Sequence, residues 1–234
     1  MRKAIAILAV AAFAALPLTA DKYKDEDRLV SCGQVMKEVL NIPDDIPQSL
    51  IDRAECVIVL PSVLKGGFIV GGSYGRGAMT CRSGDQFNGP WGAPTMMAME
   101  GGSVGFQAGG QATDYVLLVM NEDGARAILS SKVKLGGDAS AAIGPLGRDA
   151  SASTDATMRA EVLSYSRTRG VFAGIALDGA SLRPDDDANQ ALYGKYTNAR
   201  EIVLHGVFPP PESAKGLLSV LNQHSPVSAH KPSK

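Results

Sequence analysis

A serine, an aspartate and a histidine in this chain have the order of a hydrolytic triad. Ser103 lies in Gly101-Gly102-Ser103-Val104-Gly105, which matches G-x-S-x-G, and Asp178 and His205 follow it. A nucleophile elbow places its serine between a strand and a helix. The residues after Ser103 are instead glycine-rich and lead into another strand-like segment. We therefore expect Ser103 to be a small residue in a crowded sheet, with a serine esterase as the alternative function.

Other catalytic or cofactor-binding patterns are missing from the sequence. Neither GxGxxG nor GxxxxGK[ST] occurs, and the three cysteines and three histidines match no zinc spacing. The run Asp185-Asp186-Asp187 has the charge for calcium but is not followed by a glycine-centred loop with a closing glutamate. We interpret this run as a helix cap and expect no catalytic activity, metal or cofactor.

Cations beside glycine-rich or apolar segments are the more promising candidates. Clustered on one face, they would bind phosphate oxygens while the apolar surface beside them meets acyl chains. The best placed are Lys65, Arg76, Arg82 and Arg148, because nearby glycines let a phosphate approach the backbone; Arg167 and Arg169 are reserves. The alternative is that all six are ordinary surface cations spread over several faces.

Glycine-rich segments surround two of these cations. The stretch PSVLKGGFIVGGSYGRG (61–77) places glycines on both sides of Phe68-Ile69-Val70, and GGSVGFQAGGQ (101–111) repeats the pattern. Glycine at this density weakens strands and is tolerated at bulges, bends or close backbone approaches. The sequence therefore favours a bent, glycine-rich sheet over a doubly wound nucleotide-binding fold.

Hydrophobic periodicity and turn residues place the remaining elements. Apolar spacing predicts a helix over 26–40, and Pro47 begins a second, short helix. Further helices are expected at 125–130, 185–193 and 212–223. Strands are expected at 56–60, 67–73, 77–82, 95–100, 103–108, 115–120 and 133–135, with hairpin arms at 161–168 and 171–177. The prediction is one α+β domain, a bent and mainly antiparallel sheet with short helices at its ends.

The first twenty residues have the pattern of a secretory signal peptide. Arg2 and Lys3 precede an apolar run, and Leu18-Thr19-Ala20 at the end of this run resembles a signal-peptidase cleavage site, which prefers small residues. We expect cleavage after Ala20, export to the periplasm or medium, a domain over 21–223 and a disordered tail over 224–234. Without Arg2 and Lys3 the 23 basic residues fall to 21 against 24 acidic ones, a net charge of −3. No basic excess favours nucleic acid as a partner.

An ordered set of short motifs resembles the SYLF domain family, in its secreted bacterial branch. The set runs from about Arg28 to Leu221. Its members include Ala54-Glu55-Cys56, Pro61, Lys65-Gly66-Gly67-Phe68, Gly71-Gly72-x-Tyr74-Gly75-Arg76-Gly77, Cys81-Arg82, Trp91-Gly92-Ala93-Pro94, Gly101-Gly102-Ser103-x-Gly105-Phe106-Gln107, Thr113-Asp114, Gly144-Pro145-x-Gly147-Arg148, Ser164-Tyr165-Ser166-Arg167-x-Arg169-Gly170, Phe172-Ala173-Gly174 and Tyr193-Gly194.

This resemblance implies a non-enzymatic protein that binds phospholipid head groups, phosphoinositides in eukaryotic members. Some fungal members also bind actin, a role that we do not expect for an exported protein. The expected partner is an anionic phospholipid or membrane surface of the cell envelope, bound by Lys65, Arg76, Arg82 and Arg148. A structural envelope protein that binds another protein is a further alternative.

One disulfide is expected among the three cysteines. Cys56 opens one predicted strand and Cys81 lies in another, and both positions match landmarks of the secreted family branch. We predict a Cys56–Cys81 disulfide. Cys32 falls on the apolar stripe of the first helix, where a free thiol behaves as a small hydrophobe.

Overall fold

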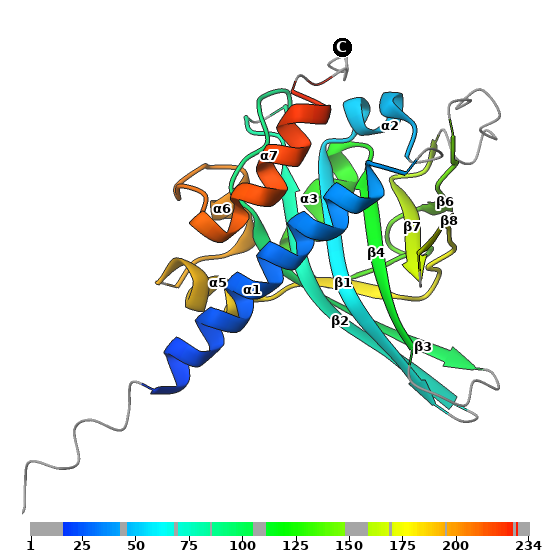
Figure 1. Ribbon diagram of the computed structural model, residues 1–234, viewed down its shortest axis with the longest axis horizontal. Helices are drawn as coiled ribbons and strands as arrows, with labels where there is room; N and C mark the ends of the chain where they lie inside the picture. The colour runs from blue at the N-terminus through cyan, green and yellow to red at the C-terminus, as the bar shows by residue number, and fades with distance from the viewer. Residues whose placement is uncertain are drawn as a thin grey trace, which may run out of the picture.

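The computed structural model describes residues 16–42, 46–67, 70–84, 86–104, 111–147, 159–168, 170–194, 196–226 and 228. Within these ranges nine strands form one sheet in the order β5-β9-β3-β2-β1-β4-β7-β6, and β8 pairs with β7. Its neighbours are antiparallel except for the parallel pair β6 and β7. The sheet is strongly curved, and one long helix crosses it (Figure 1). The predicted α+β class, with a bent and mainly antiparallel sheet, is confirmed.

The strands are β1 (Cys56–Gly67), β2 (Val70–Cys81), β3 (Thr95–Val104), β4 (Gln111–Val119), β5 (Val133–Lys134), β6 (Ala141–Ile143), β7 (Val162–Thr168), β8 (Val171–Gly174) and β9 (Ser181–Pro184). The helices are α1 (Leu16–Val39), α2 (Gln48–Arg53), α3 (Glu122–Ser130), α5 (Asp186–Tyr193), α6 (Ala199–Val203), the 3-10 turn η2 (Glu212–Ala214) and α7 (Lys215–His224).

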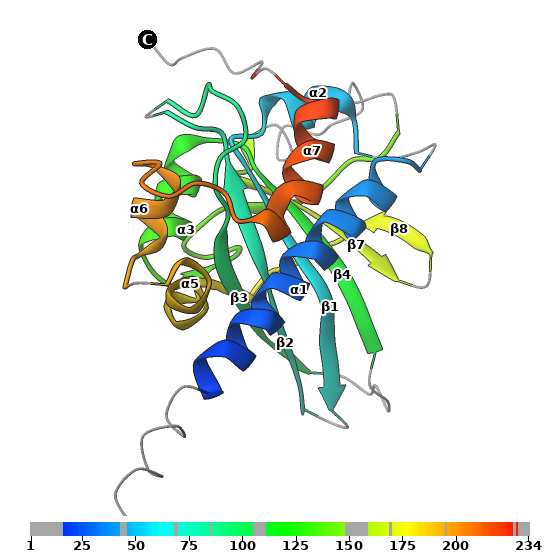
Figure 2. The same ribbon diagram turned by 60° about the vertical axis from the view of Figure 1, so that its left-hand side comes forward.

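Both faces of the central part of the sheet are covered, which explains the unbroken apolar run in β4. In β4 the side chains of Tyr115 and Leu117 join the hydrophobic cluster under α3 and α6, whereas Val116 and Leu118 join the cluster under α1, α2, α5 and α7. We call these the α3 face and the α1 face. Figure 2 shows α1 and α7 side by side over β1 and β2. Burial on both faces favours continuous rather than alternating apolar residues, and the apolar run from Tyr115 to Val119 is buried throughout.

The first helix follows its predicted apolar stripe but begins earlier in the chain. The stripe packs Leu29, Cys32 and Met36 into the α1 face, and all three side chains are fully buried. Gly33 lies where α1 crosses α7, and a Cβ there would stand 2.8 Å from the Leu217 backbone nitrogen. A side chain at position 33 would therefore force the two helices apart. None of the described helices is long and apolar enough to cross a bilayer.

Gly75, Gly77, Gly101 and Gly102 lie inside strands and do not separate the strands expected on either side of them. The expected strand 67–73 is wrong at its start, because Gly67 ends β1; from Val70 onward it continues into the expected 77–82 as β2, and the expected 95–100 and 103–108 join as β3, which the structure describes to Val104. The glycines instead accommodate a bulge in β1, where the register shifts between Val59 and Leu64. A Cβ on Gly77 would stand 1.9 Å from the Val59 carbonyl oxygen. Glycine here allows a close backbone approach and keeps the strand continuous.

Most of the other expected elements are present. The helix in 185–193 is α5, the last helix is η2 with α7, and the hairpin arms are β7 and β8. Asp185 caps α5 by accepting a hydrogen bond from the Ala188 amide, which bears out the capping interpretation of the acidic run. The short elements β6, β9 and α6 were not expected, because too few residues carry their periodicity.

Cys56 and Cys81 face each other across β1 and β2. They are register partners in the antiparallel ladder, and their sulfur atoms are bonded at 2.10 Å. Cys32 is a buried free thiol whose Sγ donates to the Val59 carbonyl oxygen. Burial raises the pKa of the Cys32 thiol to about 12, so it stays protonated and acts as part of the core.

Candidate functional site

The four cations predicted from sequence do not form one cleft. Lys65 is the register partner of Ser73 in β2, so its side chain points to the same face as Ser73. Arg76 lies three residues further along β2 and points to the opposite face. Lys65 accordingly stands on the α3 face, with its Nζ 5.3 Å from the centre of the Tyr115 ring, while Arg76 stands on the α1 face. Arg148, like the reserve Arg169, lies outside the described residues.

Arg82 is the clearest departure from the expected site, because its side chain is fully buried. Its Nε donates to the Ala54 carbonyl oxygen at 3.2 Å and its Nη2 to the Ser225 hydroxyl at 2.5 Å. The guanidinium also stacks 4.4 Å from the centre of the Trp91 ring. The Ser225 hydroxyl in turn donates to Asp52. Arg82 therefore ties the end of α7 to the sheet and has no surface to offer a lipid head group.

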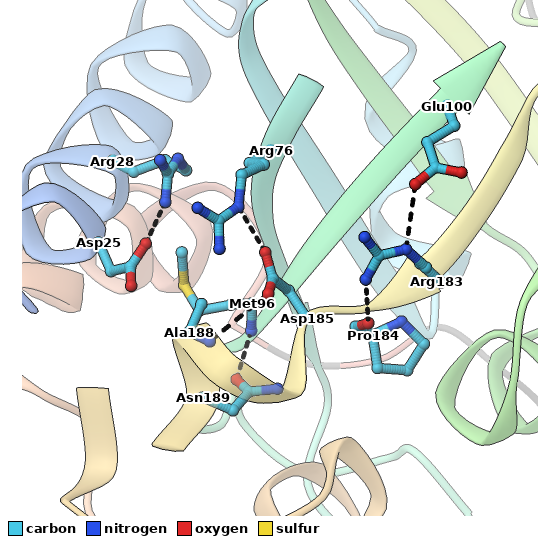
Figure 3. A network of polar contacts seen from close by, with 10 residues as sticks. All are labelled: Asp25, Arg28, Arg76, Met96, Glu100, Arg183, Pro184, Asp185, Ala188 and Asn189. Atoms are coloured by element: carbon cyan, nitrogen blue, oxygen red, sulfur yellow. Dashed lines mark hydrogen bonds and ion pairs between the residues drawn. The ribbon is translucent and has the colours of Figure 1, made fainter. Parts of the chain in front are cut away.

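Two ion pairs lie close together here, one between Arg76 of β2 and Asp185 at the start of α5 and one within α1 (Figure 3). The Arg76 Nε donates to the Asp185 carboxylate at 2.5 Å, and this bond is the main reason why the pKa of Arg76 is raised. Asp25 on α1 pairs with Arg28 one turn later. Desolvation nevertheless raises the pKa of the buried Asp25 carboxyl, against the lowering effect of Arg28 and Arg76.

A pocket of about 380 Å³ opens beside these ion pairs, and we call it the Arg76 pocket. Its charged lining residues are Asp21, Lys24, Asp25, Arg76 and Asp187. Three carboxylates thus face two cations, and one of those cations is already bonded to Asp185. The described lining of the Arg76 pocket thus carries more negative than positive charge, and the phosphate site that the sequence suggested at Arg76 stays a prediction.

The reserve cation Arg167 is also held by carboxylates of the protein. It donates to Asp114, its register partner in β4, at 2.7 Å and pairs with Glu38 on α1. Asp114 accepts a further bond from the amide of Ser62 in the β1 bulge. This cluster fastens the end of α1 to the sheet and has two carboxylates for one guanidinium.

A serine esterase that uses Ser103 would need a strand-to-helix turn at this residue, and the described residues do not form one. Ser103 lies inside β3, opposite Gly71 of β2, and the next element that the structure describes is another strand, β4. A nucleophile elbow requires a strand-to-helix turn. Within the described residues, moreover, no group of three or more His, Cys, Asp or Glu side chains is arranged to hold a metal ion. Ser103 is placed as a strand residue.

Two large side chains are exposed where β1 to β4 project beyond the helices (Figures 1 and 2). Leu64 is 62% exposed and Tyr74 is 48% exposed. They are register partners in β1 and β2 and therefore neighbours on the same face. We call this pair with Lys65 the free end of the sheet. Phe68 and Ile69, which the sequence places between β1 and β2, lie outside the described residues.

Sequence reasoning missed a second pocket, of about 340 Å³, which we call the Arg53 pocket. Arg53 ends α2 and Arg159 comes shortly before β7, so the two are 106 positions apart in sequence. They meet because β1, β4 and β7 are adjacent in the sheet. An arginine next to each predicted strand was visible in the sequence, but the order of the strands was not.

Comparison with known proteins identifies the family. Residues 100–224 match the Ysc84 family, described as "Las17-binding protein actin regulator". The chain belongs to this family. It is 35% identical over 189 residues to an SH3 domain-containing protein of Schizosaccharomyces pombe, covering 80% of this chain and 43% of that protein. It is 31% identical over 191 residues to LAS seventeen-binding protein 3 of Saccharomyces cerevisiae, covering 80% and 40%.

An animal relative shows the same pattern. The SH3 domain-containing YSC84-like protein 1 of Xenopus laevis is 34% identical over 207 residues, covering 85% of this chain and 60% of that protein. The chain therefore spans about half the length of the relatives that it matches, and the predicted SYLF resemblance is confirmed at the level of the domain. The family is one of binding and regulatory domains and is not a known enzyme family.

Proposed function

We propose that this chain is a non-enzymatic domain that attaches to anionic phospholipid surfaces through the free end of its sheet. The observation that carries the proposal is the exposure of Leu64 and Tyr74 as a cross-strand pair beyond the helices. Burying apolar side chains in a membrane interface recovers about 25 cal/mol per Å² of surface removed from water. A pair of this size gives weak, reversible attachment.

Lys65 supplies the electrostatic part of this attachment. It is half-buried against Tyr115 on the opposite side of the same strand end. A lysine near an anionic membrane contributes about 1 kcal/mol, and salt screens that attraction. Residues 21–234 carry a net charge of −3, so the attraction comes from a local cation and not from the whole molecule.

Vesicle flotation tests the proposal with matched exposed residues. The double variant Leu64→Ser/Tyr74→Ser is expected to lose binding to phosphatidylglycerol-containing vesicles several-fold, and Lys65→Ala to lose less. The control is Tyr196→Ser/Val207→Ser, a second exposed aromatic and aliphatic pair, distant in sequence from the free end. It should bind as the wild type does. Equal binding by both double variants, or salt-independent binding to neutral vesicles, would rule out attachment through the free end.

A protein partner is the second candidate, because one relative is named as a Las17-binding protein. An exposed apolar pair on a projecting sheet also fits a protein surface. If Leu64→Ser/Tyr74→Ser leaves vesicle binding intact but abolishes the capture of one defined envelope protein, the protein partner is favoured. The support for a protein partner is weaker than that for a lipid surface, because it comes from the name of a relative of which the match covers only 40%.

We also propose that the chain is exported, on the basis of its first twenty residues. Cleavage after Ala20 would remove the first five residues of α1 and leave Asp21 and Lys22 at the new N-terminus. N-terminal sequencing of the protein from an envelope fraction should then begin at Asp21. An intact Met1 in that fraction would contradict it.

A further inference from the structure

The Arg53 pocket lies at the opposite end of the sheet from the exposed pair. Leu64 pairs with Ala112 near the start of β4, whereas Met120, just past the end of β4, lines the pocket. Eight residues of extended strand separate these points by roughly 25 Å. The pocket is therefore a separate place on the molecule, and whatever occupies it is not held by the free end.

Its lining combines two cations with an apolar wall. Arg53 and Arg159 supply the charge, Asn121 supplies an amide, and the wall consists of Leu50, Met120, Ala160 and Leu163. Among the described residues, no carboxylate lines this pocket. Within the described residues, neither guanidinium has a hydrogen bond or an ion pair, in contrast to the carboxylate-bonded Arg76 and Arg167.

The acidic residues next to the lining residues in sequence are engaged elsewhere. Asp52, beside Arg53, accepts bonds from Gln48 and Ser225. Glu122, beside Asn121, is bonded to Arg126, and Glu161, near Arg159, accepts bonds from the Ser140 amide and hydroxyl. Among the described residues, none of these three carboxylates therefore bonds Arg53 or Arg159.

We propose that this pocket binds a single-chain anionic amphiphile, a phosphate or carboxylate head carried on one short acyl or alkyl chain. Arginine presents paired N–H donors that match the oxygens of both head groups, and the apolar wall takes the chain. The volume of about 340 Å³ is at the low end of small-molecule sites, roughly 300–1,000 Å³. That size favours one chain over the two of a diacyl phospholipid.

Titration calorimetry of the full chain tests this with three probes at monomeric concentrations: octyl phosphate, octyl glucoside and inorganic phosphate. We expect octyl phosphate to bind at least about tenfold more tightly than either of the others, because only it offers both a charged head and a chain. Equal affinity for inorganic phosphate would overturn the role of the apolar wall. Equal affinity for octyl glucoside would overturn the role of the arginines, and no binding of octyl phosphate would overturn the site.

Variants locate the binding. Arg53→Gln and Arg159→Gln are each expected to weaken octyl phosphate roughly tenfold, the usual effect of losing a charged hydrogen bond. The control, Arg200→Gln, changes an exposed arginine on α6 and should stay within about twofold. Unchanged affinity in the Arg53→Gln/Arg159→Gln variant would refute the proposal.

A wild-type measurement guards against variants that fail to fold. The methyl resonance of Met120, assigned through Met120→Leu, should shift on titration with octyl phosphate, and the absence of a shift at saturation would contradict the site. The same variants distinguish the proposed lipid attachment through the free end from the proposed binding in the Arg53 pocket. Leu64→Ser/Tyr74→Ser should still bind octyl phosphate, and Arg53→Gln/Arg159→Gln should still bind vesicles.

Discussion

The Arg76 pocket and the Arg53 pocket are of similar size and both are lined by arginine, yet the charged groups around their arginines differ. In the Arg76 pocket three carboxylates face two cations, and Asp185 already bonds the guanidinium. In the Arg53 pocket two arginines stand beside an apolar wall, and none of the described lining residues is a carboxylate. Arginine alone therefore does not mark an anion site. The residues that surround its guanidinium decide whether the charge holds the fold together or remains available to a ligand.

This distinction gives an expected division of mutational effects. Arginines bonded by the protein should affect stability when replaced, because their removal leaves buried acceptors or carboxylates without a partner. Arginines without such bonds should affect ligand binding and leave stability nearly unchanged. Arg82 and Arg76 belong to the first class, and Arg53 and Arg159 to the second.

The largest contrast is expected between Arg82→Ala and Arg53→Ala. Arg82 is fully buried and joins Ala54, Trp91 and Ser225, so its loss should lower the free energy of unfolding by about 3–5 kcal/mol. Arg53→Ala changes a half-buried side chain that has no bond to the described residues, so the free energy of unfolding should change by no more than about 0.5 kcal/mol. Urea denaturation measures both. Similar losses in the two variants would show that burial and bonding do not separate these arginines.

The buried carboxyl group of Glu55 should also affect stability, by less than Arg82 and in a way that depends on pH. Glu55 adjoins Arg82 in the fold, and its pKa is raised to about 7, chiefly by burial, with Glu122 and Asp123 adding and Arg126 opposing. The folded state thus holds a proton that the unfolded chain releases near pH 4.5. Stability contributed by protonated Glu55 is present below pH 4.5 and is lost as the pH rises to about 7.

Replacing this carboxyl should remove that loss. Glu55→Gln is expected to gain about 2–3 kcal/mol over the wild type at pH 8 and little at pH 4. Thermal or urea unfolding from pH 4 to pH 8 measures the difference between the two proteins. A constant difference across this range would mean that Glu55 does not titrate there.

The face of the sheet on which each cation lies could not be predicted from the sequence, and the cause is geometric. Whether Lys65 and Arg76 share a face depends on the register of β1 against β2, and a one-residue shift reverses every side chain. Here the pairing of β1 with β2 shifts by one residue at the bulge between Val59 and Leu64. The sequence indicated a bulge through its glycines but carried no signal for its position. The burial of Arg82 depends on Ser225, 143 residues away, which local patterns do not reveal.

Local patterns succeeded where neighbouring residues decide the outcome. The apolar stripe that begins at Leu29 placed the first helix, and Asp185 marked the start of α5, because both signals lie within a few turns of chain. The Arg53 pocket required the order of β1, β4 and β7, which depends on contacts across the whole domain. The esterase alternative failed for the same reason, since the motif around Ser103 is local and the elbow it needs is not.

The smallest expected effect comes from Asp185→Asn, which removes the carboxylate that bonds Arg76 in the Arg76 pocket. Asp185→Asn keeps an oxygen able to cap α5 but removes the charge that bonds Arg76. We expect a loss of about 1–2 kcal/mol, because the ion pair is partly exposed, with the Arg76 side chain 30% accessible. In the same variant Arg76 should gain weak affinity for octyl phosphate, below that of the Arg53 pocket, since Asp21, Asp25 and Asp187 remain.

A double-mutant cycle that combines Asp185→Asn with Arg76→Ala measures the coupling energy between the two side chains. A coupling near zero would show that Asp185 does not hold Arg76, and the contrast between the two pockets would then rest on the lining carboxylates alone.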